Sequence, residues 1–143
     1  MKRLIALGLV ILCVFAFAAC SSSKERIWVW TQSVNQEDIR SVTPWRQDGE
    51  FTVLEPLDDA QIRELVTLLN KLTKDSFTEN KKLTGGTPVY GIEIVVDSVT
   101  YNLDDAIGSH GSLEIDDNEK MWWIDDETLS AFVQKVTDIT PAE

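Results

Sequence analysis

The chain has little that would serve catalysis or metal binding. Its only histidine, His110, lies among glycines and serines, as in a flexible loop, whereas a zinc site needs more His or Cys ligands. Ser, His and Asp do not occur in a recognisable hydrolase frame such as a nucleophile elbow. Gly85-Gly86 precedes a predicted strand and lacks the helix N-terminus that would hold phosphate. The sequence therefore predicts no catalytic residue, no metal site and no cofactor.

Basic residues are also few. The chain contains 13 Lys and Arg residues and 24 Asp and Glu residues, which give a formal net charge of −11. A surface that binds nucleic acid needs clustered Lys and Arg to displace counterions from phosphate. Nucleic acid is therefore not an expected partner, and the same charge repels the folded part from anionic lipid.

One long apolar run, Leu4 to Ala19, follows Lys2 and Arg3 at the N-terminus, a pattern typical of an export signal. Its end, Phe17-Ala18-Ala19-Cys20, resembles the lipobox of bacterial lipoproteins, in which the cysteine thiol receives a lipid before the signal is removed. The family pattern has Leu where this chain has Phe17. The alternatives are a secreted chain and an uncleaved helix, because the run is near the lower limit of the ~17 to 25 residues that span a bilayer.

This resemblance divides the chain into a signal peptide at 1–19, a lipidated cysteine with a short linker at 20–26, and one domain at 27–143. It implies that Cys20 is the lipid attachment site and that the protein is anchored at the extracytoplasmic face of the cell membrane. Lipidation of Cys20 leaves no thiol for a disulfide or for redox chemistry. A six-residue linker reaches at most ~20 Å, so we expect the domain close to the membrane.

The first part of the domain is predicted to contain two strands. Ile27 to Thr31 is apolar on both faces and rich in residues that favour strands. Ser41 to Glu50 contains Pro44 and Asp48-Gly49 and is predicted to be a turn-forming stretch. The short apolar run from Phe51 to Leu54 predicts the second strand.

Two hairpins are predicted in the second half. Apolar residues alternate from Tyr90 to Val96 and again from Val99 to Leu103, on either side of Asp97-Ser98. Leu113 to Ile115 and Met121 to Ile124 flank a polar turn and form the second pair. Ser76 to Glu79 is a candidate edge strand, and Lys81 to Pro88 is a predicted loop.

Two amphipathic helices complete the prediction. Asp58 caps a helix that runs to Leu72, with Gln61 returning a capping-box hydrogen bond, and Asp125 caps a closing helix. Each helix has one apolar face. Since the sheet is largely connected by hairpins, we expect an α+β domain with a single antiparallel sheet and both helices packed on one of its faces. The predicted core faces are Ile62, Leu65, Val66, Leu69 and Leu72 in the first helix and Leu129, Phe132, Val133 and Val136 in the second.

Acidic side chains concentrate in the second half, where calcium, which takes oxygen ligands, is the first candidate ligand. The spacing matches no calcium-binding motif, and turns and helix caps account for many of these residues. Solvated turns are the favoured interpretation, with weak divalent binding and an acid/base carboxylate pair as alternatives. The residues are Glu93, Asp97, Asp104, Asp105, Glu114, Asp116, Asp117, Glu119, Asp125, Asp126 and Glu127.

Four of the five tryptophans form the candidate binding surface. Trp28 and Trp30 share a face of the predicted strand and would form a platform for a sugar ring or a partner protein. Trp122 and Trp123 are adjacent, so in a strand they point to opposite faces and one of them leaves the helix-covered core. That residue either packs against another aromatic side chain or stands exposed as an anchor.

In layout, the whole chain is similar to the small uncharacterised lipoproteins of Gram-positive bacteria, a resemblance whose specific motif is the lipobox ending at Cys20. It implies no catalytic residues. We therefore predict a membrane-anchored extracytoplasmic lipoprotein that binds an envelope protein or a wall component and is not an enzyme. The alternative is a ligand-binding lipoprotein that holds a glycan on its tryptophans or calcium at its acidic turns.

Overall fold

A computed structural model describes residues 23–79, 89–105, 113–116 and 120–139 of the chain. The signal peptide and Cys20 lie outside these residues. The elements in chain order are helix α2 (Ser23–Ser33), 3-10 helix η1 (Gln36–Asp38), strands β1 (Ile39–Asp48) and β2 (Glu50–Val53), helix α3 (Asp59–Leu69), 3-10 helix η2 (Lys74–Ser76), strands β3 (Phe77–Glu79), β4 (Tyr90–Val96), β5 (Val99–Asp105), β6 (Leu113–Asp116) and β7 (Met121–Ile124), and helix α4 (Glu127–Val136).

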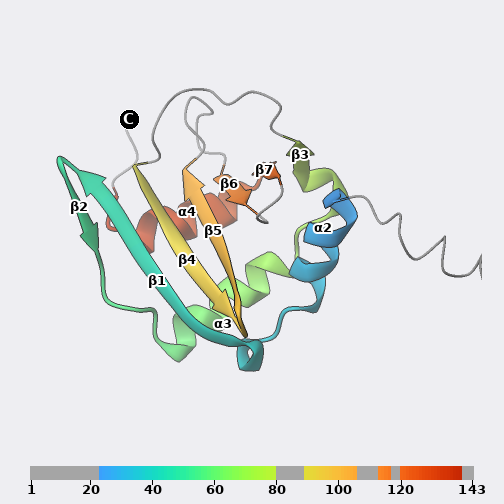
Figure 1. Cartoon of the computed structure of the whole chain (residues 1–143), viewed down its shortest axis with the longest axis horizontal. Coiled ribbons are helices and arrows are strands. Elements are labelled where there is room, and N and C mark those ends of the chain that lie inside the picture. Colours follow the sequence, from blue (N-terminus) through green and yellow to red (C-terminus); the bar gives the residue numbers. More distant parts are fainter. Residues whose placement is uncertain (1–22, 80–88, 106–112, 117–119, 140–143) are drawn as a thin grey trace, which may run out of the picture.

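Seven strands form one sheet in the order β2-β1-β4-β5-β6-β7-β3, and every neighbouring pair is antiparallel. In the view of Figure 1, α3 and α4 cross behind the central strands and α2 lies to the right of them. The predicted fold class, an α+β domain with helices on one face of an antiparallel sheet, is confirmed. A third helix, α2, joins the two that the sequence predicts.

The core fills the space between the helices and the sheet. The apolar residues Ile92 and Ile94 of β4 and Leu113 and Ile115 of β6 are buried toward the helices, and Gly91 and Glu114 on the other face of these strands are buried as well. The predicted core faces of the two helices are confirmed, since all of their residues are buried except Val136, which is partly buried. Arg63, Glu64, Thr67 and Lys71 are exposed as expected. The largest fully buried side chains are Ile27, Leu65, Leu69, Leu72, Phe77, Ile92, Ile94, Leu103, Leu113, Ile115, Ile124 and Leu129.

The start of α3 matches the prediction in atomic detail. The Asp58 carboxylate accepts a hydrogen bond from the Gln61 backbone N–H at 2.8 Å, and the Gln61 side-chain oxygen accepts one from the Asp58 N–H at 3.0 Å. The prediction for the closing helix is wrong by one residue. Asp126, and not Asp125, caps α4, because its carboxylate accepts a hydrogen bond from the Leu129 N–H at 2.8 Å.

Both predicted hairpins and the edge strand are confirmed. β4 and β5 pair around Asp97-Ser98, with Asp97 in the left-handed conformation at φ 53°, and β6 pairs with β7. β3 lies at the edge of the sheet beside β7. The connecting turn at 117–119 and the predicted loop at 81–88 lie outside the described residues.

The predicted strand at Ile27 to Thr31 is wrong, because these residues belong to helix α2. Ile27, Thr31 and Val34 follow a helical spacing and are 1%, 0% and 3% exposed. Thr31 tolerates burial because its hydroxyl donates to the Trp28 carbonyl oxygen at 2.8 Å. Helix α2 begins at Ser23, so residues 23–26 of the expected linker are its first turn.

The predicted turn at Ser41 to Glu50 is also wrong over most of its length. β1 occupies residues 39–48, and only Gly49, at φ 80°, turns the chain back into β2. Pro44 is accommodated because its carbonyl oxygen accepts from the Leu54 N–H at 2.9 Å, so the backbone of Pro44 faces the short strand β2. Its missing N–H therefore removes no hydrogen bond to the central strand β4.

Candidate functional site

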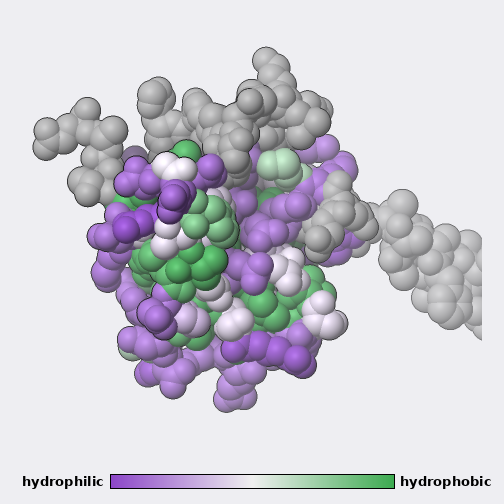
Figure 2. Space-filling model, turned by 60° about the vertical axis from the view of Figure 1, so that its left-hand side comes forward, coloured by the Kyte–Doolittle hydropathy of each residue, from purple (hydrophilic) through white to green (hydrophobic). Residues whose placement is uncertain are grey.

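The face of the sheet opposite the helices carries the candidate site, and we call it the open face because none of the described helices packs on it. Its side chains alternate with the buried ones that point to the helices. Hydrophobic side chains gather near its β1–β2 edge, with hydrophilic residues around them (Figure 2). From the strand registers, its members include Thr43, Trp45, Phe51, Val53, Glu93, Asn102, Asp104, Glu114, Asp116 and Trp123. These ten include four carboxylates and no Lys or Arg.

One row of residues crosses the centre of the open face, each directly opposite the next on a neighbouring strand. Trp45 lies opposite Gly91, Gly91 opposite Asp104, Asp104 opposite Glu114 and Glu114 opposite Trp123. Neighbouring strands are about 4.8 Å apart, so this central row spans roughly 19 Å from the first tryptophan to the second. Two carboxyl groups thus lie between two aromatic side chains.

Gly91 is the one member of the row without a side chain, and the space above it is occupied. A methyl group built at Gly91 would collide with the Asp104 carboxylate oxygen Oδ1 and would lie 3.0 Å from both the Asp104 Cα and the Leu103 carbonyl oxygen. The Asp104 side chain therefore lies over the backbone of β4, on the side of Trp45. A larger residue at position 91 would move it.

The two carboxyl groups have different hydrogen-bond environments. Glu114 is 7% exposed, and its Oε1 accepts a hydrogen bond from the indole Nε1 of Trp123 at 2.5 Å. Oδ1 of Asp104 is buried and has no hydrogen-bond partner among the described residues. A buried oxygen without a hydrogen-bond partner destabilises the folded state. Such atoms are rare in native proteins, and a functional role is one explanation for them.

Burial in the first place, and then the negative charges of Glu114 and Asp116, raise the pKa of Asp104 to about 7, against a hydrogen bond from Trp45 that lowers it. Burial also raises the pKa of Asp105 on the helix side of β5. Near neutral pH the Asp104 carboxyl is therefore protonated in part of the molecules. The central row can hold a proton, accept hydrogen bonds from a hydroxyl or cationic group, and stack that group against Trp45.

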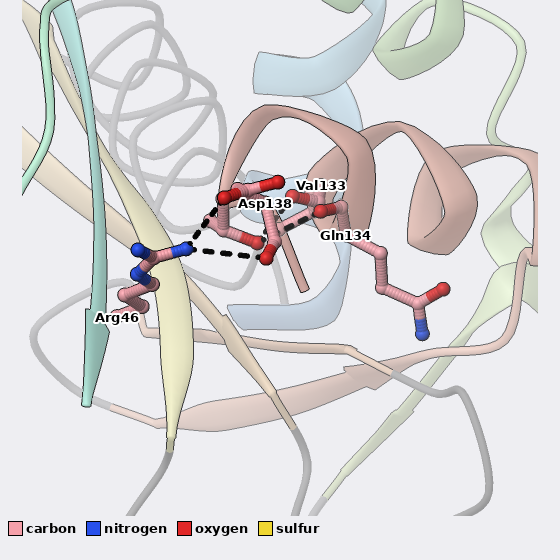
Figure 3. A network of polar contacts seen from close by, with 5 residues as sticks. Arg46, Val133, Gln134 and Asp138 are labelled. Carbon is pink, nitrogen blue, oxygen red and sulfur yellow. Dashed lines mark hydrogen bonds and ion pairs between the residues drawn. The ribbon is translucent and has the colours of Figure 1, made fainter. Parts of the chain in front are cut away.

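Arg46 holds β1, and with it Trp45, against the helical layer. From the helix side of β1, its Nη1 donates to Oδ2 of Asp138 at 2.8 Å and to the Asp138 carbonyl oxygen at 3.2 Å (Figure 3). Asp138 follows α4 in the left-handed conformation, at φ 55°. Thr137 closes the end of the helix by donating to the carbonyl oxygens of Val133 and Gln134. The end of α4 is therefore tied to the strand next to β2.

The structure separates the four tryptophans of the predicted surface. Trp28 and Trp30 lie on helix α2, so the prediction that they share a strand face is wrong. Trp30 stacks on Tyr101 at a centroid distance of 3.9 Å, and the Lys74 Nζ lies 5.6 Å from the Trp28 ring. The prediction that Trp122 and Trp123 point to opposite faces is confirmed, with Trp122 3% exposed in the core and Trp123 in the central row.

The acidic residues fall into several structural roles. Asp97 is a turn residue and Asp126 a helix cap, as the favoured interpretation holds. The described residues include no group of three or more His, Cys, Asp or Glu placed to hold a metal ion. Asp117, Glu119 and His110 lie outside the described residues, so the calcium alternative stays a prediction.

Trp45, Gly91 and the pairing of Asp104 with Glu114 are the parts of the site that the sequence analysis missed. The sequence around Trp45 predicts a turn, and Asp104 and Glu114 are two members of a long acidic set. Alternation within β4 and β5 does place Asp104 on the face opposite Leu103. The register between β1 and β4, which unites the row, leaves no signal in a single sequence.

Comparison with known proteins gives a similarity of fold. No protein-family model and no curated protein matches the chain. The crystal structure of a protein named "Putative Lipoprotein from Clostridium perfringens" is similar to this one, with 17% sequence identity and a TM-score of 0.61. The match covers 83% of this chain and 99% of that one. None of the helices in the described part of the chain is long and apolar enough to cross a membrane. The chain thus shares the fold of a protein from a Gram-positive bacterium that is named as a lipoprotein.

Proposed function

We propose that this chain is a lipid-anchored extracytoplasmic lipoprotein whose domain binds another component of the cell envelope through the open face. A protein is the favoured partner. The observation that carries the proposal is the exposure of Phe51 and Val53, whose side chains are 62% and 59% exposed on that face. Trp45, with its ring centroid 5.5 Å from that of Phe51, extends this apolar surface toward the central row.

Exposed aromatic and apolar side chains beside buried polar groups are typical of interaction surfaces. Burying a large apolar side chain yields about 1.5 to 3 kcal/mol, and binding energy concentrates at aromatic anchors near the centre of an interface. The helical layer has no comparable aromatic exposure among the described residues, whose exposed large apolar side chains are Val29, Phe51, Val53, Val89 and Val99. The open face is therefore the favoured binding surface.

A second candidate function, binding of a small hydroxylated ligand such as a wall glycan, is favoured by one observation. The partnerless oxygen Oδ1 of Asp104 lies next to Trp45 in the central row. An aromatic ring beside a hydrogen-bond acceptor suits a sugar ring, which offers both an apolar face and hydroxyl donors.

The anchor is tested by replacing Cys20. A Cys20→Ala variant should lose its lipid, and a chain that begins at Ser21 should be found in the soluble fraction and remain folded, because the core of the described residues begins at Ile27. Mass spectrometry of the membrane-extracted parent chain should find an acylated N-terminal cysteine. An N-terminus at Met1, or an unmodified secreted chain, would contradict the lipid anchor.

The binding face is tested by photo-crosslinking in intact cells. A photoreactive amino acid at Thr43 on the open face should give discrete crosslinked products on a gel. The same amino acid at Arg63, an exposed position on α3, serves as the matched control and should give none. Equal crosslinking from both positions, or products from Arg63 alone, would show that the open face is not the binding surface.

A further inference from the structure

Strand β2 forms one edge of the sheet, and no described strand pairs with its outer side. The Leu54 N–H donates to the Pro44 carbonyl oxygen at 2.9 Å, and Arg46 lies opposite Thr52 in the same ladder. In an antiparallel pair, hydrogen-bonded positions alternate with positions whose N–H and C=O point away from the partner strand. The backbone N–H and C=O groups of Phe51 and Val53 therefore point outward, and β2 is the last strand in the order of the sheet.

The same two residues expose their side chains. All four residues of β2 are exposed, and Phe51 and Val53 project onto the open face beside Trp45. A strand added along β2 would pair with the outward groups and lay its own apolar side chains against Phe51 and Val53. Backbone hydrogen bonds and apolar contact would thus form at the same positions.

The charge of this edge selects the kind of strand that fits. Proteins commonly protect an exposed edge with Lys, a proline, a bulge or a covering helix. Asp48, Glu50 and Glu55 lie along the edge and are exposed, and the sequence has neither Lys nor Arg between Arg46 and Arg63. The edge is therefore negative, and the shortness of β2 is its main protection.

These features point away from a second copy of this chain as the occupant. Pairing β2 with itself would bring the acidic residues of both copies to one edge, between chains that each carry a formal net charge of −11. A segment that alternates apolar residues with Lys or Arg would instead place its cations near Asp48, Glu50 and Glu55.

We propose that β2 is a strand-addition site for an extended segment of a partner protein in which apolar residues alternate with Lys or Arg. This inference rests on the proposed function, because it names the class of protein that the open face receives. In strand addition, hydrogen bonds between the two backbones supply the affinity, and alternate side chains of the added strand supply the specificity. Because β2 has only four residues, the affinity should be modest.

The experiment measures the binding of fluorescent peptides to the full lipidated chain in detergent, by anisotropy. The probe is a peptide in which Lys and Val alternate. Two controls are a peptide in which Glu and Val alternate, and a Lys-Val peptide of the same charge whose alternate backbone amides are N-methylated so that they cannot pair with a strand. Saturable binding of the first, at least ~10-fold tighter than that of both controls, is expected. Equal binding of the two Lys-Val peptides would overturn the proposal, because charge alone would then explain it.

A Val53→Pro variant tests the site itself. Proline at this position removes an outward N–H and leaves the ladder with β1 in place, so binding of the Lys-Val peptide should weaken by at least ~10-fold. The Val53→Thr variant keeps the N–H and should bind like the parent chain. Unchanged binding by a folded Val53→Pro variant would overturn the assignment to β2. If that variant does not fold, strand addition is still tested by comparing the binding of the unmethylated and N-methylated Lys-Val peptides to the parent chain.

The failure of this inference is distinguishable from failure of the proposed function. Crosslinks from Thr43 in cells, together with equal binding of the two Lys-Val peptides, would leave the open face as a binding surface and exclude strand addition. Loss of the crosslinks would remove the proposed function itself.

Discussion

An Asp104→Asn variant is expected to be more stable than the parent chain at pH 8 and to keep only a smaller part of this advantage at pH 5. The reason is that the folded chain raises the pKa of this carboxyl from the ordinary 3.8 to about 7, through burial first and then through the charges of Glu114 and Asp116. Ionising Asp104 in the folded state is therefore unfavourable. Asparagine keeps the size and the acceptor oxygen of the side chain and carries no charge.

The direction of the pH dependence follows from proton binding. Between pH 4 and 7 the unfolded chain releases the Asp104 proton while the folded chain retains it, so the free energy of unfolding of the parent falls as the pH rises through this window. Above pH 7 the contribution of Asp104 no longer changes. Each unit of pKa corresponds to about 1.4 kcal/mol, and after a discount for partial exposure of the side chain we expect a gain of ~2 kcal/mol at pH 8.

The measurement is a thermal melt of both proteins at pH 5 and pH 8. A gain of this size corresponds to roughly 5 to 10 °C in Tm for a domain of this length. Asp97→Asn is the matched control, because Asp97 is exposed in a turn and asparagine also adopts its left-handed conformation. A variant that is destabilised at pH 8, or displaced equally at both pH values, would show that the charge of Asp104 is not the cause. A residue whose charge destabilises the folded protein is typical of a functional position.

Leu69→Ala and Phe132→Ala are expected to destabilise the domain severely. Leu69 on α3 is 0% exposed and Phe132 on α4 is 4% exposed, and the two helices contact each other while α4 also contacts β4. Truncating a buried Leu or Phe to Ala usually costs ~2 to 5 kcal/mol, because the lost transfer free energy adds to the cost of the cavity. This is a large part of the ~5 to 15 kcal/mol that stabilises a domain.

Chemical denaturation of the two variants checks this expectation. Lys71→Ala is the control, since Lys71 is exposed just after α3 and its side chain contributes little to the core. Free energies of unfolding that cannot be told apart among the three variants would mean that the helices hold the sheet less tightly than their packing indicates.

Local chemistry accounts for the parts of the fold that could be predicted. The two hairpins connect strands only a few residues apart, so alternation of apolar residues and a short turn suffice to define them. The helices α3 and α4 carry their caps and apolar faces within one segment, and the one-residue error at Asp126 reflects two adjacent aspartates that can both cap. That Trp122 and Trp123 point to opposite faces of the sheet follows from alternation alone.

The tertiary structure overrode local preference in the first part of the domain. Ile27 to Thr31 favours a strand by composition, yet Ile27 and Val34 are buried together only if the segment is helical, and the helix lies against α3 and β3. Pro44 indicates a turn by itself, but its backbone faces β2, where a missing N–H costs little. In both segments, contacts with distant residues decide the conformation.

The sequence by itself determined the class of the fold, the hairpins, the two helical faces and the acidic charge, since these depend on residues close together in the chain. Only the tertiary structure decided that Trp45 of β1 joins Gly91, Asp104, Glu114 and Trp123 in one row, and that Phe51 and Val53 lie exposed at the edge of the sheet. The pairing of β1 with β4 joins residues about fifty positions apart, and its register follows from the packing of the whole sheet on the helices. The pairing of β5 with β6 places Asp104 opposite Glu114, whose charge adds to the effect of burial on the pKa of Asp104.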